Sequence, residues 1–219
     1  NQDAADRLQN LGEEEWRIHN VGAPQLDDML GTLPELKEIS SKISSFEYNL
    51  CVYHAVTEEF DNVATYINAF CKAVKSDPRK RVWILPNNDA GSSLVRAEII
   101  ESMSDDIIFD NLSREKYLSL LKYCNCIVGN SSSGILEAPF YKIPAINVGN
   151  RQFGRIQANN VINCGNSETE IIQALNEIKN IDRKIIVSAY GDGKTSKRIL
   201  ELLEKNFGRK NLLTKRMTY

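Results

Sequence analysis

The segment richest in chemically useful residues is VGNSSSGILEAPF, at residues 128–140. We predict that a strand ends at Val128 and that a short helix follows the small residues 129–134. Small residues let the backbone approach a ligand closely, and free N–H groups at the start of a helix attract phosphate. The predicted phosphate-binding residues are Ser131, Ser132, Ser133 and Gly134. A plain Ser N-cap without a ligand would have the same composition, so this alternative stays open.

Glu137 lies in the same segment, four residues after Ser133, and therefore misses the three-residue spacing of a capping box that starts there. We place it on the first turn of the short helix. A carboxylate at this position could accept hydrogen bonds from two ribose hydroxyls. Alternatively, Glu137 is a helix-start glutamate that only the helix dipole favours.

A second candidate segment is VYHAVTEE, where His54 closes a predicted strand just before a helix that Thr57 would cap. A histidine at the carboxyl end of a strand points toward the crevice where α/β proteins bind ligands. As a cation it could neutralise a phosphate, and as an acid it could protonate a leaving group. His54 is thus the candidate catalytic residue, with a purely structural histidine as the alternative.

Two further segments carry polar residues directly after predicted strands. Asn87 begins the run NNDAGS, although a turn explains that composition equally well. Arg151 lies in INVGNRQFGR between two glycines, and the guanidinium fork of arginine suits phosphate. A solvated loop arginine is the alternative there. Both residues are candidates for a binding site.

The elements that must position these residues alternate between short apolar segments and amphipathic ones. Strands are predicted at residues 17–21, 48–53, 81–86, 106–110, 125–130, 144–149 and 159–164. Helices are predicted at residues 58–75, 113–122, 167–179 and 195–207. Near-continuous apolar strands are typical of a parallel sheet covered on both faces, and the alternation predicts an open α/β fold. Ligands bind such sheets beyond the carboxyl ends of the strands.

Composition excludes several classes of protein. The 219 residues carry 27 basic and 29 acidic side chains, a formal net charge of -2, which argues against nucleic-acid binding. Mean hydropathy is -0.35, and no apolar run is long enough for a membrane span. Five widely spaced cysteines without a C-x-x-C pair predict neither a disulfide framework nor a metal site, and indicate a cytoplasmic protein.

In chain order, GNSSSGILEAP, INVGNRQFGR and YGDG resemble the C-terminal half of the UDP-N-acetylglucosamine 2-epimerases. The Arg151-Gln152 stretch resembles the hydrolysing branch, which feeds the synthesis of sialic-acid-type sugars. The resemblance implies a Rossmann-like sheet that forms one half of a GT-B-type two-domain fold. It also implies a domain division, because DRLQNLGEEEWRIHNVGAPQLD resembles the end of the first domain and the crossing between domains. We therefore expect residues 1–24 to form that crossing and residues 25–219 the UDP-binding domain.

The resemblance assigns roles residue by residue. His54 matches a histidine near the diphosphate, and Glu137 matches the glutamate that holds the ribose. The other matched UDP contacts are Asn87, Ser131, Ser132 and Arg151. The implied activity is the conversion of UDP-N-acetylglucosamine into UDP and N-acetylmannosamine, without a cofactor.

The family's acidic catalytic groups lie in a first domain that is almost entirely absent, so we expect this chain alone to be inactive. Its expected partners are a UDP-sugar and that first domain, and a homodimer is compatible with the family. Two alternatives remain: the donor-binding domain of a GT-B glycosyltransferase and a non-catalytic nucleotide-binding module. The sugar could be N-acetylglucosamine or a bacterial diacetamido-trideoxy sugar.

Overall fold

The computed structural model describes residues 1–209 and 211–215 and divides the chain into two compact units. The smaller unit combines Asn1–Thr32 with Ser188–Tyr219, and the larger unit is Leu33–Val187. All of the predicted site residues belong to the larger unit. The division predicted at residue 24 stays a prediction.

A parallel sheet of six strands forms the centre of the larger unit, in the order β3-β2-β1-β4-β5-β6. The strands are β1 (Tyr48–Val52), β2 (Lys80–Ile84), β3 (Ile107–Phe109), β4 (Cys126–Gly129), β5 (Ala145–Val148) and β6 (Val161–Cys164). Every residue of β1, β4 and β5 is buried, as their continuous apolar sequences predict. The predicted α/β class with an open parallel sheet is therefore confirmed.

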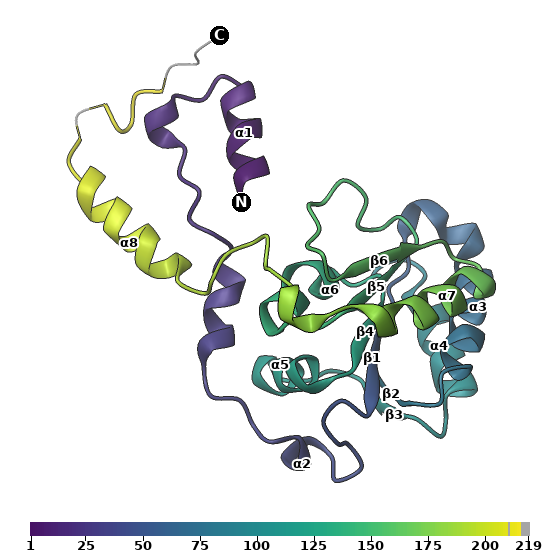
Figure 1. Ribbon diagram of the computed structural model, residues 1–219. Helices are drawn as coiled ribbons and strands as arrows, with labels where there is room; N and C mark the ends of the chain where they lie inside the picture. The colour runs from purple at the N-terminus through teal and green to yellow at the C-terminus, as the bar shows by residue number, and fades with distance from the viewer. Residues whose placement is uncertain (210, 216–219) are drawn as a thin grey trace. The chain divides into compact units, whose positions relative to one another are not determined.

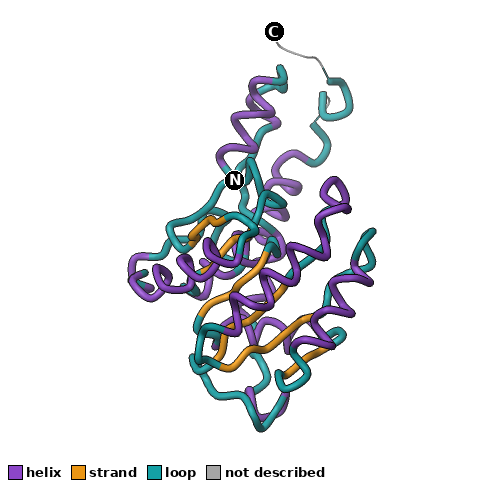
Figure 2. Tube along the Cα trace, turned by 90° about the vertical axis from the view of Figure 1, so that its right-hand side faces the viewer, coloured by secondary structure: helices purple, strands orange, loops and turns teal. Residues whose placement is uncertain are grey.

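Helices cover both faces of this sheet (Figures 1 and 2). One face carries α3 (Val63–Lys75), α4 (Ser92–Ser102) and α7 (Glu168–Glu177), and the other carries α5 (Arg114–Tyr123), α6 (Ser133–Leu136) and η4 (Ala138–Tyr141). Alternate residues of β1 serve the two cores: Cys51 packs with the α3 side and Leu50 with the α5 side. A sheet buried on both faces is rigid, so the loops at its ends are held in fixed positions.

Four short helices complete the larger unit. They are α2 (Leu36–Ile39), η3 (Thr57–Asn62), η5 (Ile178–Asn180) and η6 (Arg183–Ile185). The predicted helix at 58–75 is in fact η3 followed by α3, because Glu59 has non-helical backbone angles. The first turn after β1 is thus separate from the long helix and belongs to the loop that carries His54.

The smaller unit consists of α1 (Gln2–Asn10), η1 (Glu15–Arg17), η2 (Pro24–Leu30) and α8 (Thr195–Asn206). Asp27 caps α8 from a distant position, since its carboxylate accepts hydrogen bonds from the Thr195 and Ser196 amides at 2.9 and 2.6 Å. These bonds, chiefly those from Ser196, lower the pKa of Asp27. The strand predicted at 17–21 is wrong: η1 ends at Arg17, and no strand follows in this segment.

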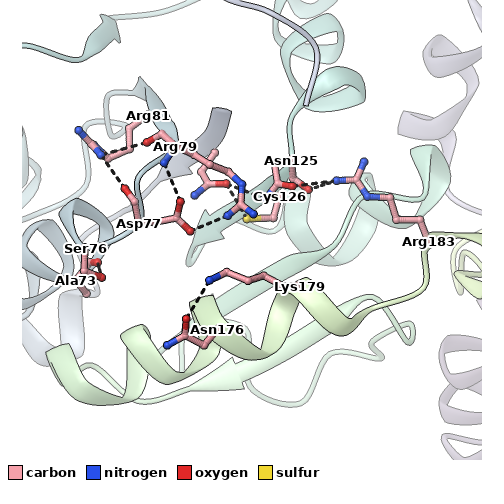
Figure 3. Close-up of polar contacts among 11 residues, drawn as sticks. Ala73, Ser76, Asp77, Arg79, Arg81, Asn125, Cys126, Asn176, Lys179 and Arg183 are labelled. Atoms are coloured by element: carbon pink, nitrogen blue, oxygen red, sulfur yellow. Dashed lines mark hydrogen bonds and ion pairs between the residues drawn. The ribbon is translucent and has the colours of Figure 1, made fainter. Parts of the chain in front are cut away.

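The amino ends of the strands form a polar edge, drawn in Figure 3. There the buried Asp77 accepts a hydrogen bond from Arg79 Nη1 at 2.8 Å. Asn125 Nδ2 donates to the buried Asn49 Oδ1 at 3.1 Å, and Arg183 reaches Asn125 from after α7. These hydrogen bonds connect the loops at this edge, although the buried Asn49 Nδ2 has no partner among the described residues. Among the described residues, no helix is long and apolar enough to cross a membrane.

Candidate nucleotide-binding site at the carboxyl ends of the strands

The site lies where the strand order reverses. The chain builds β1, β2 and β3 toward one edge and then returns to place β4 on the other side of β1. At such a switch point the loops after the two neighbouring strands diverge and leave a crevice. The loops after β1 and β4 begin at Tyr53 and Asn130 and carry His54 and the serines.

Gly129 allows these two loops to start close together. It is the last residue of β4, pairs with Val52 in β1, and has a φ of 136°. A Cβ at this position would lie 2.0 Å from the Val52 carbonyl oxygen, which no side chain can accommodate. The glycine is therefore required by the close approach of β1 and β4 at the site.

Asn130 then connects the two loops. Its Oδ1 accepts from the backbone N–H of His54 at 2.7 Å, and its Nδ2 donates to the His54 carbonyl oxygen at 2.8 Å. Its own carbonyl oxygen accepts from Gln152 Nε2 at 2.8 Å and from Arg151 Nη1 at 3.3 Å. One buried asparagine thus links the loops after β1, β4 and β5.

The His54 ring contacts the loop after β2. Its Nδ1 lies 3.3 Å from Asn87 Oδ1 and 3.4 Å from the Asn87 backbone nitrogen, so Asn87 can serve either tautomer. No described residue bonds to Nε2, which leaves that nitrogen for a ligand. Burial first, and then the charge of Arg151, lower the pKa of His54, whereas Asn87 and Asp89 raise it. The ring therefore favours its neutral form more than an exposed histidine would.

The serine loop, residues 131–133, has backbone N–H groups that precede only the short helix α6. Ser131 Oγ accepts from the Ser133 amide at 3.3 Å, and Ser132 is the N-cap of α6 without a side-chain cap bond. No described residue accepts a hydrogen bond from the amides of Ser131 and Ser132. Because α6 has only four residues, its dipole is small, and these N–H groups with the serine hydroxyls are the relevant anion donors.

Glu137 lies at the far end of α6 rather than in its first turn, which corrects the predicted position. Its side chain is 9% exposed, and Oε1 accepts from Arg114 Nη1 at 2.6 Å. Oε2 is enclosed and has no partner among the described residues. A buried acceptor without a donor costs about 1–3 kcal/mol, so this oxygen is suited to a hydroxyl that arrives with a ligand. The nearby Tyr117 hydroxyl has a raised pKa, owing first to burial and then to Glu137.

Arg151 lines a hollow of about 570 Å³ between the loops after β1 and β5. Asn150 Nδ2 donates to Glu59 Oε1 at 2.8 Å across this hollow, and Asp89 lies on its wall. The exposed Phe153 stands at its rim. The structure thus connects His54 and Arg151 through Asn130 and places Asn87 against the His54 ring. The serine loop comes next in the chain, and Glu137 lies four residues beyond Ser133. In the described residues, no group of three or more His, Cys, Asp or Glu side chains could hold a metal ion.

A sequence model of the family described as UDP-N-acetylglucosamine 2-epimerase matches residues 1–204. The chain belongs to this family. It is 35% identical over 181 residues to a UDP-N-acetylglucosamine 2-epimerase from Neisseria meningitidis serogroup B, covering 81% of this chain and 48% of the relative. It is 32% identical over 205 residues to a hydrolysing UDP-N,N'-diacetylbacillosamine 2-epimerase from Legionella pneumophila, covering 90% and 54%.

Solved structures of the family share the fold. A structure of the UDP-GlcNAc 2-epimerase from Methanocaldococcus jannaschii matches with a TM-score of 0.73 and 18% identity, over 94% of this chain and 60% of that chain. The Neisseria meningitidis enzyme bound to UDP-GlcNAc matches with a TM-score of 0.72 and 17% identity, over 94% and 60%. These neighbours confirm the predicted GT-B-type, Rossmann-like fold. The chain spans about half the length of the curated relatives it matches.

Three residues of the site were not predicted from the sequence: Asn130, Arg114 and Gln152. Asn130 lies beside the predicted serines. Asparagine is common in any turn at the end of a strand, so its residue type alone does not reveal that its side chain bonds to a neighbouring loop. Arg114 opens a predicted helix, where its partner Glu137 could not be inferred from spacing. Only the packing of α5 against η4 and of the loop after β5 against β4 brings these side chains to the site.

Proposed function

We propose that this chain is the nucleotide-binding part of a hydrolysing UDP-N-acetylglucosamine 2-epimerase. The observation that carries the proposal is the convergence of His54, the serine loop and Arg151 at the β1–β4 switch point. A nucleotide diphosphate offers the two features that this arrangement fits: negative charge for amides and an arginine, and ribose hydroxyls for a buried carboxylate. Family membership supports the epimerase part of this proposal.

In the proposed complex the diphosphate lies against the serine loop. The Ser131 and Ser132 amides, with the hydroxyls of Ser131, Ser132 and Ser133, donate hydrogen bonds to it, and Gly134 leaves room for its approach. Arg151 supplies the positive charge. Because these donors are fixed by the sheet, they stabilise charge that develops on the phosphate as UDP leaves, without reorganising at that moment.

His54 acts next to the leaving group in this proposal. Its pKa is lowered in the free protein by burial and by Arg151. A bound diphosphate adds negative charge beside the ring and raises that pKa again, so the ring gains a proton when the nucleotide binds. The imidazolium then neutralises the phosphate or donates a proton to it, while Asn87 holds Nδ1 and leaves Nε2 for the ligand.

Glu137 holds the ribose in this proposal. Its Oε2 is enclosed, so the carboxylate must turn toward the hydroxyls when the nucleotide binds, while Arg114 keeps its contact with Oε1. Binding energy from the nucleotide, remote from the reacting carbon, orients the sugar. The ligand hydroxyl then supplies the donor that Oε2 lacks.

The proposed reaction has three steps. The proton at C2 of the sugar is removed, UDP leaves from C1, and water adds to the resulting glycal-like intermediate to give free N-acetylmannosamine. We place the acidic groups for the first step in the first domain, with residues 1–24 as the crossing and residues 25–219 as the UDP-binding domain. The hydrolysing type rests on the Arg151-Gln152 stretch, and the Legionella relative carries that description in its name.

The first test replaces Glu137, the residue proposed to bind the ribose. We expect Glu137→Gln to weaken UDP binding by the 219-residue chain about tenfold, since a neutral amide is a poorer acceptor for two hydroxyls. Isothermal titration calorimetry measures the change. Glu170→Gln is the control, because Glu170 belongs to the capping box of α7, outside the proposed nucleotide contacts. Equal affinity in the Glu137→Gln variant and the wild type would remove the ribose role.

A further inference from the structure

We propose that Asn130 is the positioning residue that holds His54 against the serine loop. The inference rests on the proposed function, because it concerns how that nucleotide site is assembled. Asn130 has no assigned contact with the ligand. Its role is to fix the distance between two loops that leave the sheet in different directions.

The contacts of Asn130 continue the β1–β4 ladder beyond the end of the strands. The last paired residues are Val52 and Gly129. The backbone N–H of Asn130 still donates to the Val52 carbonyl oxygen at 3.2 Å. Past that point the side-chain amide replaces the backbone. It accepts from the His54 N–H at 2.7 Å and donates to the His54 carbonyl oxygen at 2.8 Å. Both backbone polar groups of His54 are therefore hydrogen-bonded to Asn130, as those of a paired residue are within a sheet.

An asparagine is well suited to this position. The His54 N–H can only donate and its carbonyl can only accept, so the partner must offer one acceptor and one donor side by side. A carboxylate would face the carbonyl with a second acceptor, and a hydroxyl is too short to reach both groups. Asn130 is 1% exposed, so water cannot replace either bond.

The main chain of Asn130 joins the third loop to this arrangement. Its carbonyl oxygen receives Gln152 Nε2 at 2.8 Å and Arg151 Nη1 at 3.3 Å. Gln152 is 2% exposed, so this link is also shielded from water. A substitution to alanine keeps these backbone contacts and deletes only the two bonds to His54. The His54 link can therefore be tested separately.

The test is a double-mutant cycle on UDP affinity in the 219-residue chain. We expect Asn130→Ala to weaken UDP binding about tenfold and His54→Ala to do the same. If Asn130 acts through His54, the double variant binds UDP within about twofold of His54→Ala alone. Asn49→Ala is the matched control: Asn49 is also buried and hydrogen-bonded, but at the amino end of β1. It should lower the unfolding free energy and change UDP affinity less than about twofold.

A second readout follows the His54 ring directly. In an NMR titration of the two histidines, the pKa of His54 should rise toward its ordinary value in Asn130→Ala, since a released ring is better solvated. His19, in the smaller unit, is the internal reference. Asn130→Ser, which cannot bridge both groups, replaces Asn130→Ala if that variant does not fold.

The outcomes separate the inference from the proposed function. An additional tenfold loss in the double variant, or an unchanged pKa of His54 in Asn130→Ala, overturns the positioning role while UDP binding by the wild type stands. Absence of UDP binding by the wild-type chain overturns the proposed function and, with it, the role of Asn130 in nucleotide binding. Non-additive losses together with a raised pKa of His54 support the inference.

Discussion

At the residue scale, the charges of Arg151 and Asp89 act in opposite directions on the His54 ring. Burial is the largest cause that lowers the pKa of His54, and the charge of Arg151, which also reaches the carbonyl of Asn130, lowers it further. The hydrogen bond to Asn87 and the charge of Asp89 act in the opposite sense. The free site thus disfavours an additional positive charge. A diphosphate changes that balance, so protonation of His54 and binding of the nucleotide favour each other.

This coupling gives a prediction for Arg151→Gln. Removing the guanidinium removes a positive charge that disfavours the imidazolium, so the pKa of His54 in the free chain should rise. UDP affinity should fall about tenfold, because the variant lacks the guanidinium that binds the phosphate. NMR titration of His54 and calorimetry with UDP measure the two effects. Arg155→Gln is the control on the same loop. A His54 pKa that does not rise would show that Arg151 has no electrostatic influence on the ring.

The residue types of the site could be predicted from sequence, but the links between them could not. His54, Asn87 and Arg151 each follow an apolar strand, and parallel strands end at one edge, so their proximity follows from the fold class. Asn130 was missed because its role depends on the distance between two diverging loops. Likewise, the pair of Arg114 with Glu137 depends on how α5 packs, which periodicity does not determine.

At the scale of elements, the end of β4 determines the shape of the site. Gly129→Ala would place a Cβ 2.0 Å from the Val52 carbonyl oxygen at a φ of 136°. We expect it to lower the free energy of unfolding by about 3 kcal/mol or more and to abolish UDP binding, since β1 and β4 must separate. Gly154→Ala is the control, because its φ is also positive, at 76°, but nothing lies within 4 Å.

Urea denaturation measures both glycine variants. The control should lose about 1 kcal/mol, the cost of a left-handed backbone alone. Comparable losses in the two variants would mean that close strand approach contributes nothing beyond backbone conformation. The comparison therefore isolates the contact between β1 and β4 from the general cost of replacing a glycine.

The elements themselves were predicted with uneven success, and each difference has a physical reason. The buried strands were found because apolar runs follow from burial on both faces. Helix α4 was missed because its apolar residues are not confined to one face: Val95 and Ile99 are buried, but Leu94 and Ile100 are exposed. The strand predicted at 17–21 has β-forming residues but no neighbouring strand to pair with.

At the scale of the whole molecule, the described residues form a larger unit built on a six-stranded sheet and a second, smaller unit. All of the proposed UDP contacts come from the larger unit. The chain covers 48% of the Neisseria relative and 54% of the Legionella relative, so the relatives contain a further half that it does not match. Under the proposed function, this chain binds the nucleotide and the unmatched half completes conversion of the sugar, so the two properties can be measured separately.

The last prediction follows from this division. We expect the 219-residue chain to bind UDP-N-acetylglucosamine without releasing UDP, because we propose that the groups that remove the C2 proton belong to the unmatched half. A fusion with that half of the Legionella relative, given UDP-N-acetylglucosamine or UDP-N,N'-diacetylbacillosamine in turn, should release UDP and the free 2-epimeric sugar from one of them, detected by 31P NMR and sugar analysis. His54→Ala in the fusion should slow UDP release about 100-fold, within the range for a general acid. Formation of UDP-N-acetylmannosamine instead would contradict the hydrolysing type, and turnover by the unfused chain would contradict the assignment of proton removal to the other half.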